Sequence, residues 1–256
     1  MSVDTRDPAP FRVRRTSPVA FAVDLGSSTA AVWAADRGVV TGPTARASGG
    51  ALIRRGRVAD LDGCVTLLTE LINRYPDPAP VADVVVACRP VLSTEAEQTL
   101  MRQVIDSAFA PRRTLFIDTV RAAAIGAGAV AGSLLVVDLG AEITETALLE
   151  QGRVTAARRA DIGTHDLGSG SGLDRLTGVV AAHVDDLRAV SGDEAMGEAT
   201  ARGLLLVGDG ALHADLPAAL EHALDLRVHR AADPCAAALN GAGRAALSAL
   251  RHPGFR

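Results

Sequence analysis

The chain has 256 residues, 48% hydrophobic and 22% charged, so it is long enough to bury a core in one or two domains without disulfides or metals. The net charge is -4, aromatic residues make up only 3%, and all 26 basic residues are arginine. This composition argues against a nucleic-acid partner, and the lack of lysine excludes the GxxxxGK[ST] phosphate loop.

The N-terminal segment 1–18 contains four arginines among prolines, which predicts a flexible basic tail. No stretch of the chain approaches the roughly 20 apolar residues that a membrane-spanning helix needs. The three cysteines, Cys64, Cys88 and Cys235, form no CxxC pair and are typical of reduced thiols in a reducing compartment. We therefore expect a cytoplasmic protein whose contact with membranes is at most peripheral.

The first half of the chain predicts an alternation of strands and helices. Residues 23–40 suit two strands joined by a polar turn, and residues 84–88 suit a strand that helices cover on both faces. Residues 61–75 and 94–109 have the apolar spacing of helices. Thr94 and Glu97 have the spacing of a capping box at the start of the second helix.

The second half predicts the same kinds of element. Residues 137–154 suit another pair of strands, and residues 204–207 suit another buried strand. Helices are expected over residues 173–190, 216–226 and 234–250. Asp233 and Pro234 have the residue types of an N-cap and a first helical position in the last of these.

An internal repeat links the two halves. The segment VDLGSSTAAVWAADRGVV from Val23 aligns without a gap with VDLGAEITETALLEQGRV from Val137, and 114 positions separate Asp24 from Asp138. We expect an α/β fold of two similar lobes that face one cleft at the ends of their strands, where ligands of open α/β sheets bind. The predicted units are residues 19–131 for lobe I, residues 132–232 for lobe II, and a C-terminal helix within residues 233–256 that packs back on lobe I.

The Asp-Leu-Gly turns suggest an anion site. Glycine lets a backbone approach a phosphate closely, turn N–H groups and hydroxyls bind it, and an aspartate can hold a hydrated Mg²⁺. The alternative is that Asp24 and Asp138 only cap their own turns. The occurrence of the motif in both halves favours the site.

These motifs resemble the actin, heat-shock chaperone and sugar kinase superfamily. VDLGSSTAAVW resembles its first phosphate loop, VVDLGAEITETALL its second, and LLLVGDGALHADLPAAL its adenosine loop. The segments VVVACRPVLSTEAEQTL, FIDTVRAAAIGAG, ADIGTHDLG and VHRAADPCAAALNGAGRAAL are closest to the bacterial rod-shape actins of the MreB/Mbl branch. The resemblance implies an actin-like, ribonuclease H-like duplicated fold around a nucleotide cleft.

The resemblance also implies a site for ATP with Mg. Its nucleotide-binding residues would be Asp24, Gly26, Ser27, Ser28, Thr29, Asp138, Gly140, Gly208 and Gly210. Asp24 and Asp138 would hold Mg²⁺ through water, and Asp118 would take the place of the acid that positions the attacking water.

The chain departs from the family pattern at several points. Ala141, Glu142 and Ile143 replace two glycines and a threonine, so Glu142 is expected to face the phosphates and to repel them. Asp209 replaces a glycine of the adenosine loop. Only residues 41–56 and 169–172 are available for the two outer subdomains, which are expected to be missing or vestigial.

The expected function is therefore a scaffold or adaptor of cell shape or cell-wall morphogenesis with weakened ATP binding. Its partners would be other bacterial actins or cell-wall morphogenesis proteins. The substituted loops favour loss of ATP hydrolysis over its retention. A small ATPase or kinase of the same superfold stays open as the alternative.

Overall fold

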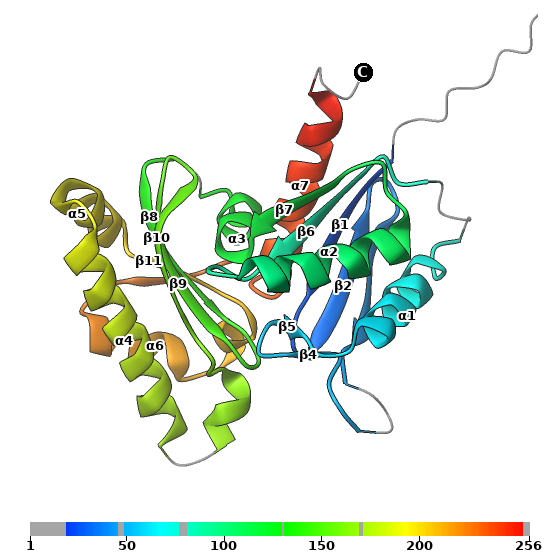
Figure 1. The fold of residues 1–256 in the computed structure, drawn as a ribbon. Coiled ribbons are helices and arrows are strands. Elements are labelled where there is room, and N and C mark those ends of the chain that lie inside the picture. The colour runs from blue at the N-terminus through cyan, green and yellow to red at the C-terminus, as the bar shows by residue number, and fades with distance from the viewer. Residues whose placement is uncertain (1–18, 46–48, 77–80, 130, 169–170, 253–256) are drawn as a thin grey trace, which may run out of the picture.

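The fold is seen in a computed structural model, which describes residues 19–45, 49–76, 81–129, 131–168 and 171–252. The tail predicted over residues 1–18 lies outside this part of the chain. Two five-stranded sheets stand side by side, each with helices on its outer face, and helices α3 (Thr119–Ala127) and α7 (Ala237–Arg251) fill the space between them (Figure 1). We call the sheets with their covering helices the first and second lobes.

The first lobe contains the sheet β3-β2-β1-β6-β7. Its strands are β1 (Ala20–Leu25), β2 (Thr29–Ala34), β3 (Gly38–Pro43), β6 (Val84–Arg89) and β7 (Thr114–Asp118). Its outer helices are α1 (Leu61–Ile72) and α2 (Glu95–Phe109). Thr94 caps α2 in the predicted capping box, accepting from Glu97 N while the Glu97 carboxylate accepts from Thr94 N.

The second lobe repeats this arrangement in the sheet β10-β9-β8-β11-β12. Its strands are β8 (Ser133–Leu139), β9 (Thr144–Glu150), β10 (Arg153–Ala160), β11 (Leu204–Val207) and β12 (Val228–Arg230). Its helices are α4 (Gly172–Val190), α5 (Asp193–Arg202) and α6 (Leu216–Leu224), with short 3-10 helices η1 (Thr164–Gly168) and η2 (Asp209–Leu212). Strand β1 pairs antiparallel with β2 and parallel with β6. Strand β8 pairs in the same way, antiparallel with β9 and parallel with β11, so the predicted duplication is confirmed.

A shared core joins the lobes. The inner faces of both sheets pack against α3 (Thr119–Ala127) and α7 (Ala237–Arg251), and small side chains such as Ala122, Ala123 and Ala242 are fully buried there. The outer face of the first sheet packs on α1 and α2, and that of the second on α4 and α6. The helix pair therefore connects the inner faces of the two sheets.

Helix α7 begins later than predicted. Its N-cap is Ala236 rather than Asp233, because Pro234 and its neighbours form a turn whose Pro234 carbonyl accepts a hydrogen bond from Gly208 N of the second lobe. This hydrogen bond holds the turn before α7 beside the end of β11, so Pro234 and Cys235 line the cleft.

Little structure occupies the places of the outer subdomains. Between β3 and α1 the described residues form the small hairpin of β4 (Ile53–Arg54) and β5 (Arg57–Val58), and between β10 and α4 they form η1. Among the described residues, no helix is both long and apolar enough to span a bilayer.

Candidate functional site

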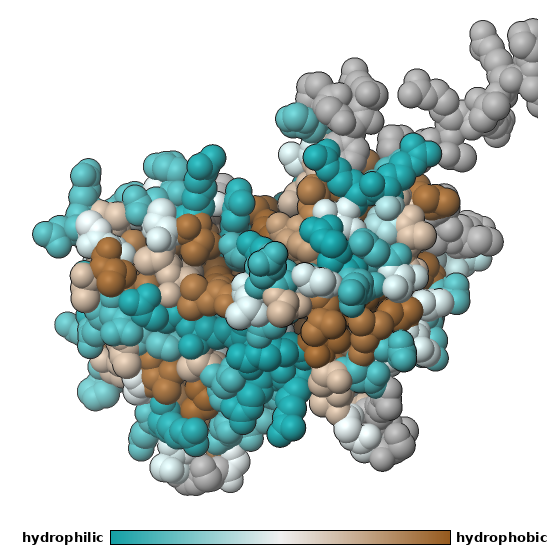
Figure 2. Space-filling model, in the orientation of Figure 1, coloured by the Kyte–Doolittle hydropathy of each residue, from teal (hydrophilic) through white to brown (hydrophobic). Residues whose placement is uncertain are grey.

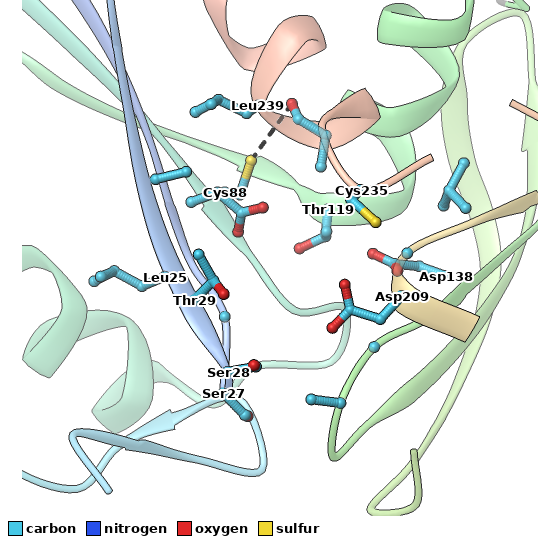
Figure 3. Close-up of a pocket in the computed structure, with 18 of the residues that line it drawn as sticks. Leu25, Ser27, Ser28, Thr29, Cys88, Thr119, Asp138, Asp209, Cys235 and Leu239 are labelled. Atoms are coloured by element: carbon cyan, nitrogen blue, oxygen red, sulfur yellow. Dashed lines mark hydrogen bonds between the residues drawn. The ribbon is translucent and has the colours of Figure 1, made fainter. Parts of the chain in front are cut away.

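A cleft of about 280 Å³ lies between the lobes where the strands β1, β6, β8 and β11 end. Both repeat hairpins reach it, since Asp24 from β1 and Asp138 from β8 line its wall. Figure 3 shows Ser27, Ser28 and Thr29 on one side of this space and Asp138 and Asp209 on the other. The prediction that Asp24 and Asp138 lie on separate lobes and face one cleft is confirmed.

The turns after β1 and β8 have the same geometry. Gly26 N donates to Thr29 O at 3.0 Å, and Gly140 N donates to Ile143 O at 2.9 Å. These residues are matched by the repeat of 114 positions. The first turn adds the hydroxyl groups of Ser27, Ser28 and Thr29 to the cleft wall, which suits binding of a phosphate.

The loop after β11 forms a third side of the cleft. Gly208 lies at φ +81, and a Cβ there would come within 2.4 Å of Asp138 Oδ1, so only glycine fits. Asp209 follows it and lines the cleft. Gly210 is the one predicted binding residue outside the lining, because it packs on Leu139, whose Cδ2 would be 2.3 Å from a Cβ at that position.

The cleft is strongly acidic. Burial, with the charge of Asp209, raises the pKa of Asp24 to about 6. Burial, with the charges of Asp24 and Asp209, raises the pKa of Asp138 to about 7. Burial beside Asp138 also raises the pKa of Glu145. Since no basic side chain is found among the described residues that line the cleft, a bound cation would relieve this repulsion.

The acid set fits a hydrated Mg²⁺ better than a tightly chelated metal. The described residues contain no cluster of three or more His, Cys, Asp or Glu side chains that could enclose an ion. Asp24 and Asp138 instead approach the cleft from opposite lobes. Mg²⁺ keeps several waters and uses one or two carboxylates together with phosphate oxygens, so these two residues are suitable holders.

The chain is similar in sequence and in fold to known proteins. Residues 51–170 match the model of the MreB/Mbl protein family. MreB5 of Spiroplasma citri bound to ADP has the same fold, with a TM-score of 0.77 at 16% identity, over 92% of this chain and 96% of that chain. The chain has the actin fold, and nearly half of it is similar to the MreB/Mbl family.

Two further solved structures share the actin fold with this chain. The MamK double helical filament has a TM-score of 0.73 at 13% identity, over 90% of this chain and 99% of that one. The ethanolamine utilization protein EutJ from Carboxydothermus hydrogenoformans has a TM-score of 0.67 at 17% identity, over 89% and 90%. No curated protein matches the sequence significantly.

Asp118, the candidate for positioning the attacking water, lies beside the cleft. It ends β7, and its Oδ1 accepts from Arg89 Nε at 3.0 Å. Arg89 is also bonded to Gln98, so the ion pair faces α2. The neighbouring Thr119 is the residue that lines the cleft, and its hydroxyl donates to Arg89 O at 2.9 Å.

The expectation for Glu142 is wrong. Its side chain is not part of the cleft wall, because Glu142 Oε2 accepts from the backbone N–H of Arg55 in the first lobe at 2.6 Å. Its other oxygen lies 4.0 Å from His165 Nδ1. The carboxylate points to the opposite lobe and does not face a phosphate site in the cleft.

The sequence reasoning missed several residues of the cleft. Glu145 of β9 is buried and accepts from Val91 N of the first lobe at 2.5 Å. A glutamate within a segment expected to form a buried strand was the signal that could have revealed it. Cys88 and Cys235 also line the cleft, and Cys88 Sγ donates weakly to Ala238 O at 3.7 Å (Figure 3). The position of Cys88 at the carboxyl end of a predicted buried strand pointed to this place.

Proposed function

We propose that this chain is a scaffold or adaptor of bacterial cell shape or cell-wall morphogenesis that binds Mg-ATP weakly in its interlobe cleft. The observation that carries the proposal is the pair of matched turns, which direct Asp24 and Asp138 from separate lobes into one cleft. The chain would act in the cytoplasm, with at most peripheral contact with the membrane. Its partners would be other bacterial actins or cell-wall morphogenesis proteins.

Nucleotide binding is supported by the site and by similar structures. The first turn offers three hydroxyl groups and the last loop offers Gly208 at the cleft wall. MreB5 of Spiroplasma citri has been solved with ADP and with AMPPNP, and it has the same fold. Asp24, Ser27, Ser28, Thr29 and Asp138 are the residues that we assign to phosphate and hydrated Mg²⁺.

Weak binding is supported by the charge and size of the cleft. Asp209 and Glu145 add two acids to the pair that would hold Mg²⁺, and the described lining supplies no arginine to offset them. The volume of about 280 Å³ lies just below the ~300–1,000 Å³ of small-molecule sites. Binding of a nucleotide would therefore require some widening of the cleft.

The same observations favour a scaffold over a kinase. A kinase cleft must hold a second substrate beside the nucleotide, and this cleft has little room for one. Asp118 lies outside the lining and is paired with Arg89, which supports the loss of a water-orienting role. A general base that is misplaced by even 1 Å can lose most of its effect.

Calorimetry of the purified protein with Mg-ATP tests the binding proposal. We expect a Kd weaker than about 10 μM, or roughly -7 kcal/mol, and loss of that binding in Asp138→Asn. Binding that persists unchanged in Asp138→Asn would contradict the assigned site. Removal of the gene from its bacterium tests the cellular role, and normal cell shape and cell-wall growth would contradict it.

A further inference from the structure

The β4–β5 hairpin of the first lobe reaches across to the second lobe. In Figure 1 its tip lies against the start of β9 and the end of β10. The turn residues are Arg55 and Gly56, and Gly56 lines the cleft. Figure 2 shows a continuous hydrophilic area over this junction. The hairpin therefore joins the lobes through polar groups at one end of the cleft.

The backbone of Arg55 is bonded to the second lobe on both sides. Its N–H donates to Glu142 Oε2 at 2.6 Å, and its carbonyl accepts from Arg159 NH2 at 2.5 Å. The Arg55 guanidinium donates to the carbonyl of Asp161. Arg57, the next residue but one, donates to Asp161 Oδ2 at 2.9 Å. Four polar contacts of Arg55 and Arg57 thus connect the hairpin to the second lobe.

The conformation of the turn is costly and is maintained by these contacts. Arg55 has φ +50 and Gly56 has φ +69, the two positive angles of a type I′ hairpin turn. A long side chain such as arginine rarely adopts this region, and such strain persists only where the surroundings enforce it. A Cβ on Gly56 would lie 3.0 Å from both Ile143 and Pro90, which are on opposite lobes.

One of the contacts at this junction is made by a buried arginine. The Arg159 side chain is only 7% exposed, and the Arg55 carbonyl is the acceptor closest to its charge. Separation of the lobes would break this charge-assisted hydrogen bond. Nearby, Glu145 of β9 accepts from Val91 N through its Oε1. A second acidic side chain of the second lobe therefore also binds a backbone N–H of the first lobe.

We propose that Glu142 and the β4–β5 hairpin form an interlobe clasp that holds the two lobes together without any nucleotide. A carboxylate of the second turn occupies the bridging role that a ligand's anion would otherwise perform, because it accepts a backbone N–H from the opposite lobe. Glu142 is a positioning residue in this clasp. The proposal concerns the nucleotide-free protein and does not depend on binding of ATP.

Hydrogen exchange of the nucleotide-free protein, followed by mass spectrometry, tests the clasp. We expect segment 53–58 to be protected in the wild type, and Glu142→Ala to speed its exchange at least tenfold, or about 1.4 kcal/mol. Glu142→Gln keeps a neutral acceptor and should restore part of the protection. Glu70→Ala, on the exposed side of α1, is the matched control and should leave the segment unchanged.

A glycine pair separates the clasp from general effects on turns. Gly56→Ala and Gly38→Ala both place a Cβ at positive φ, but nothing lies within 4 Å of the Cβ at Gly38. We expect Gly56→Ala to increase the radius of gyration in small-angle scattering and to speed exchange of segment 53–58, whereas Gly38→Ala should do neither. An unprotected segment in the wild type, or equal exchange in Glu142→Ala and the wild type, would overturn the clasp.

Discussion

At the residue scale, the buried aspartates of the cleft should make stability depend on pH. Burial, aided by neighbouring acids, raises the pKa of Asp24 to about 6 and that of Asp138 to about 7, both above the unfolded value of 3.8. Between those values the folded state binds more protons than the unfolded state, so the free energy of unfolding decreases as pH rises. The stabilisation is complete below the unfolded pKa and is lost above the folded one.

We therefore expect metal-free protein in EDTA to melt at a lower temperature near about pH 8 than near about pH 5.5. Asp138→Asn should raise the melting temperature at the higher pH by roughly 2–4 °C, about 1 kcal/mol, and should reduce the pH dependence. Thermal denaturation of both proteins across this range measures the effect. Parallel pH profiles for the two proteins would show that Asp138 does not cause the pH dependence of the melting temperature.

Asp209 should limit nucleotide affinity. It lines the cleft and its charge contributes to the raised pKa values of both Asp24 and Asp138. We expect Asp209→Asn to tighten Mg-ATP binding roughly tenfold, about 1.4 kcal/mol, by calorimetry. Asp215→Asn is the matched control because Asp215 is exposed and carries the same charge. Equal gains in both variants would indicate a change in net charge alone.

At the element scale, the contact of α3 with α7 depends on two glycines. A Cβ on Gly126 would lie 1.9 Å from Ala237 O, and one on Gly241 would lie 1.8 Å from Ala122 O, so the two helix backbones touch. We expect Gly241→Ala to destabilise the protein by about 2–3 kcal/mol, since extra methyl groups in a packed core force backbone shifts.

The control is Gly178→Ala in α4, where a Cβ meets nothing within 4 Å. This change should stabilise the protein by about 0.5–1 kcal/mol, because alanine favours a helix over glycine. Chemical denaturation of the three proteins measures both effects. If Gly241→Ala unfolds at the same denaturant concentration as the wild type, the close helix contact is not required.

At the scale of the whole molecule, the small hairpin β4–β5 and the short helix η1 are all that the described residues place where the family has outer subdomains. We expect the pure protein to form no long straight filaments with Mg-ATP, because actin-family protofilament contacts involve those subdomains. Electron microscopy tests this, with a full-length rod-shape actin as the positive control. Long straight filaments of this chain alone would contradict the prediction.

Much of the architecture could be read from local sequence. The ungapped match of residues 23–40 with residues 137–154 predicted two hairpins of the same register, and the structure has the same turn bond after Gly26 and after Gly140. Alternating breakers and apolar runs predicted the parallel strands β6 and β11. The capping box at Thr94 was predictable because its partners are only three residues apart.

The direction of particular side chains was decided only by the tertiary structure. Glu142 follows a phosphate-loop glycine in sequence, but it bonds to Arg55, 87 positions earlier, because the other lobe brings that amide within reach. Asp118 forms an ion pair with Arg89, and Glu145 accepts a hydrogen bond from Val91 N. Helix α7 begins late because the Pro234 carbonyl accepts from Gly208 N. Each of these contacts joins segments far apart in the chain. Local periodicity determines which residues form strands and turns, whereas the packing of two lobes determines which polar groups must find partners.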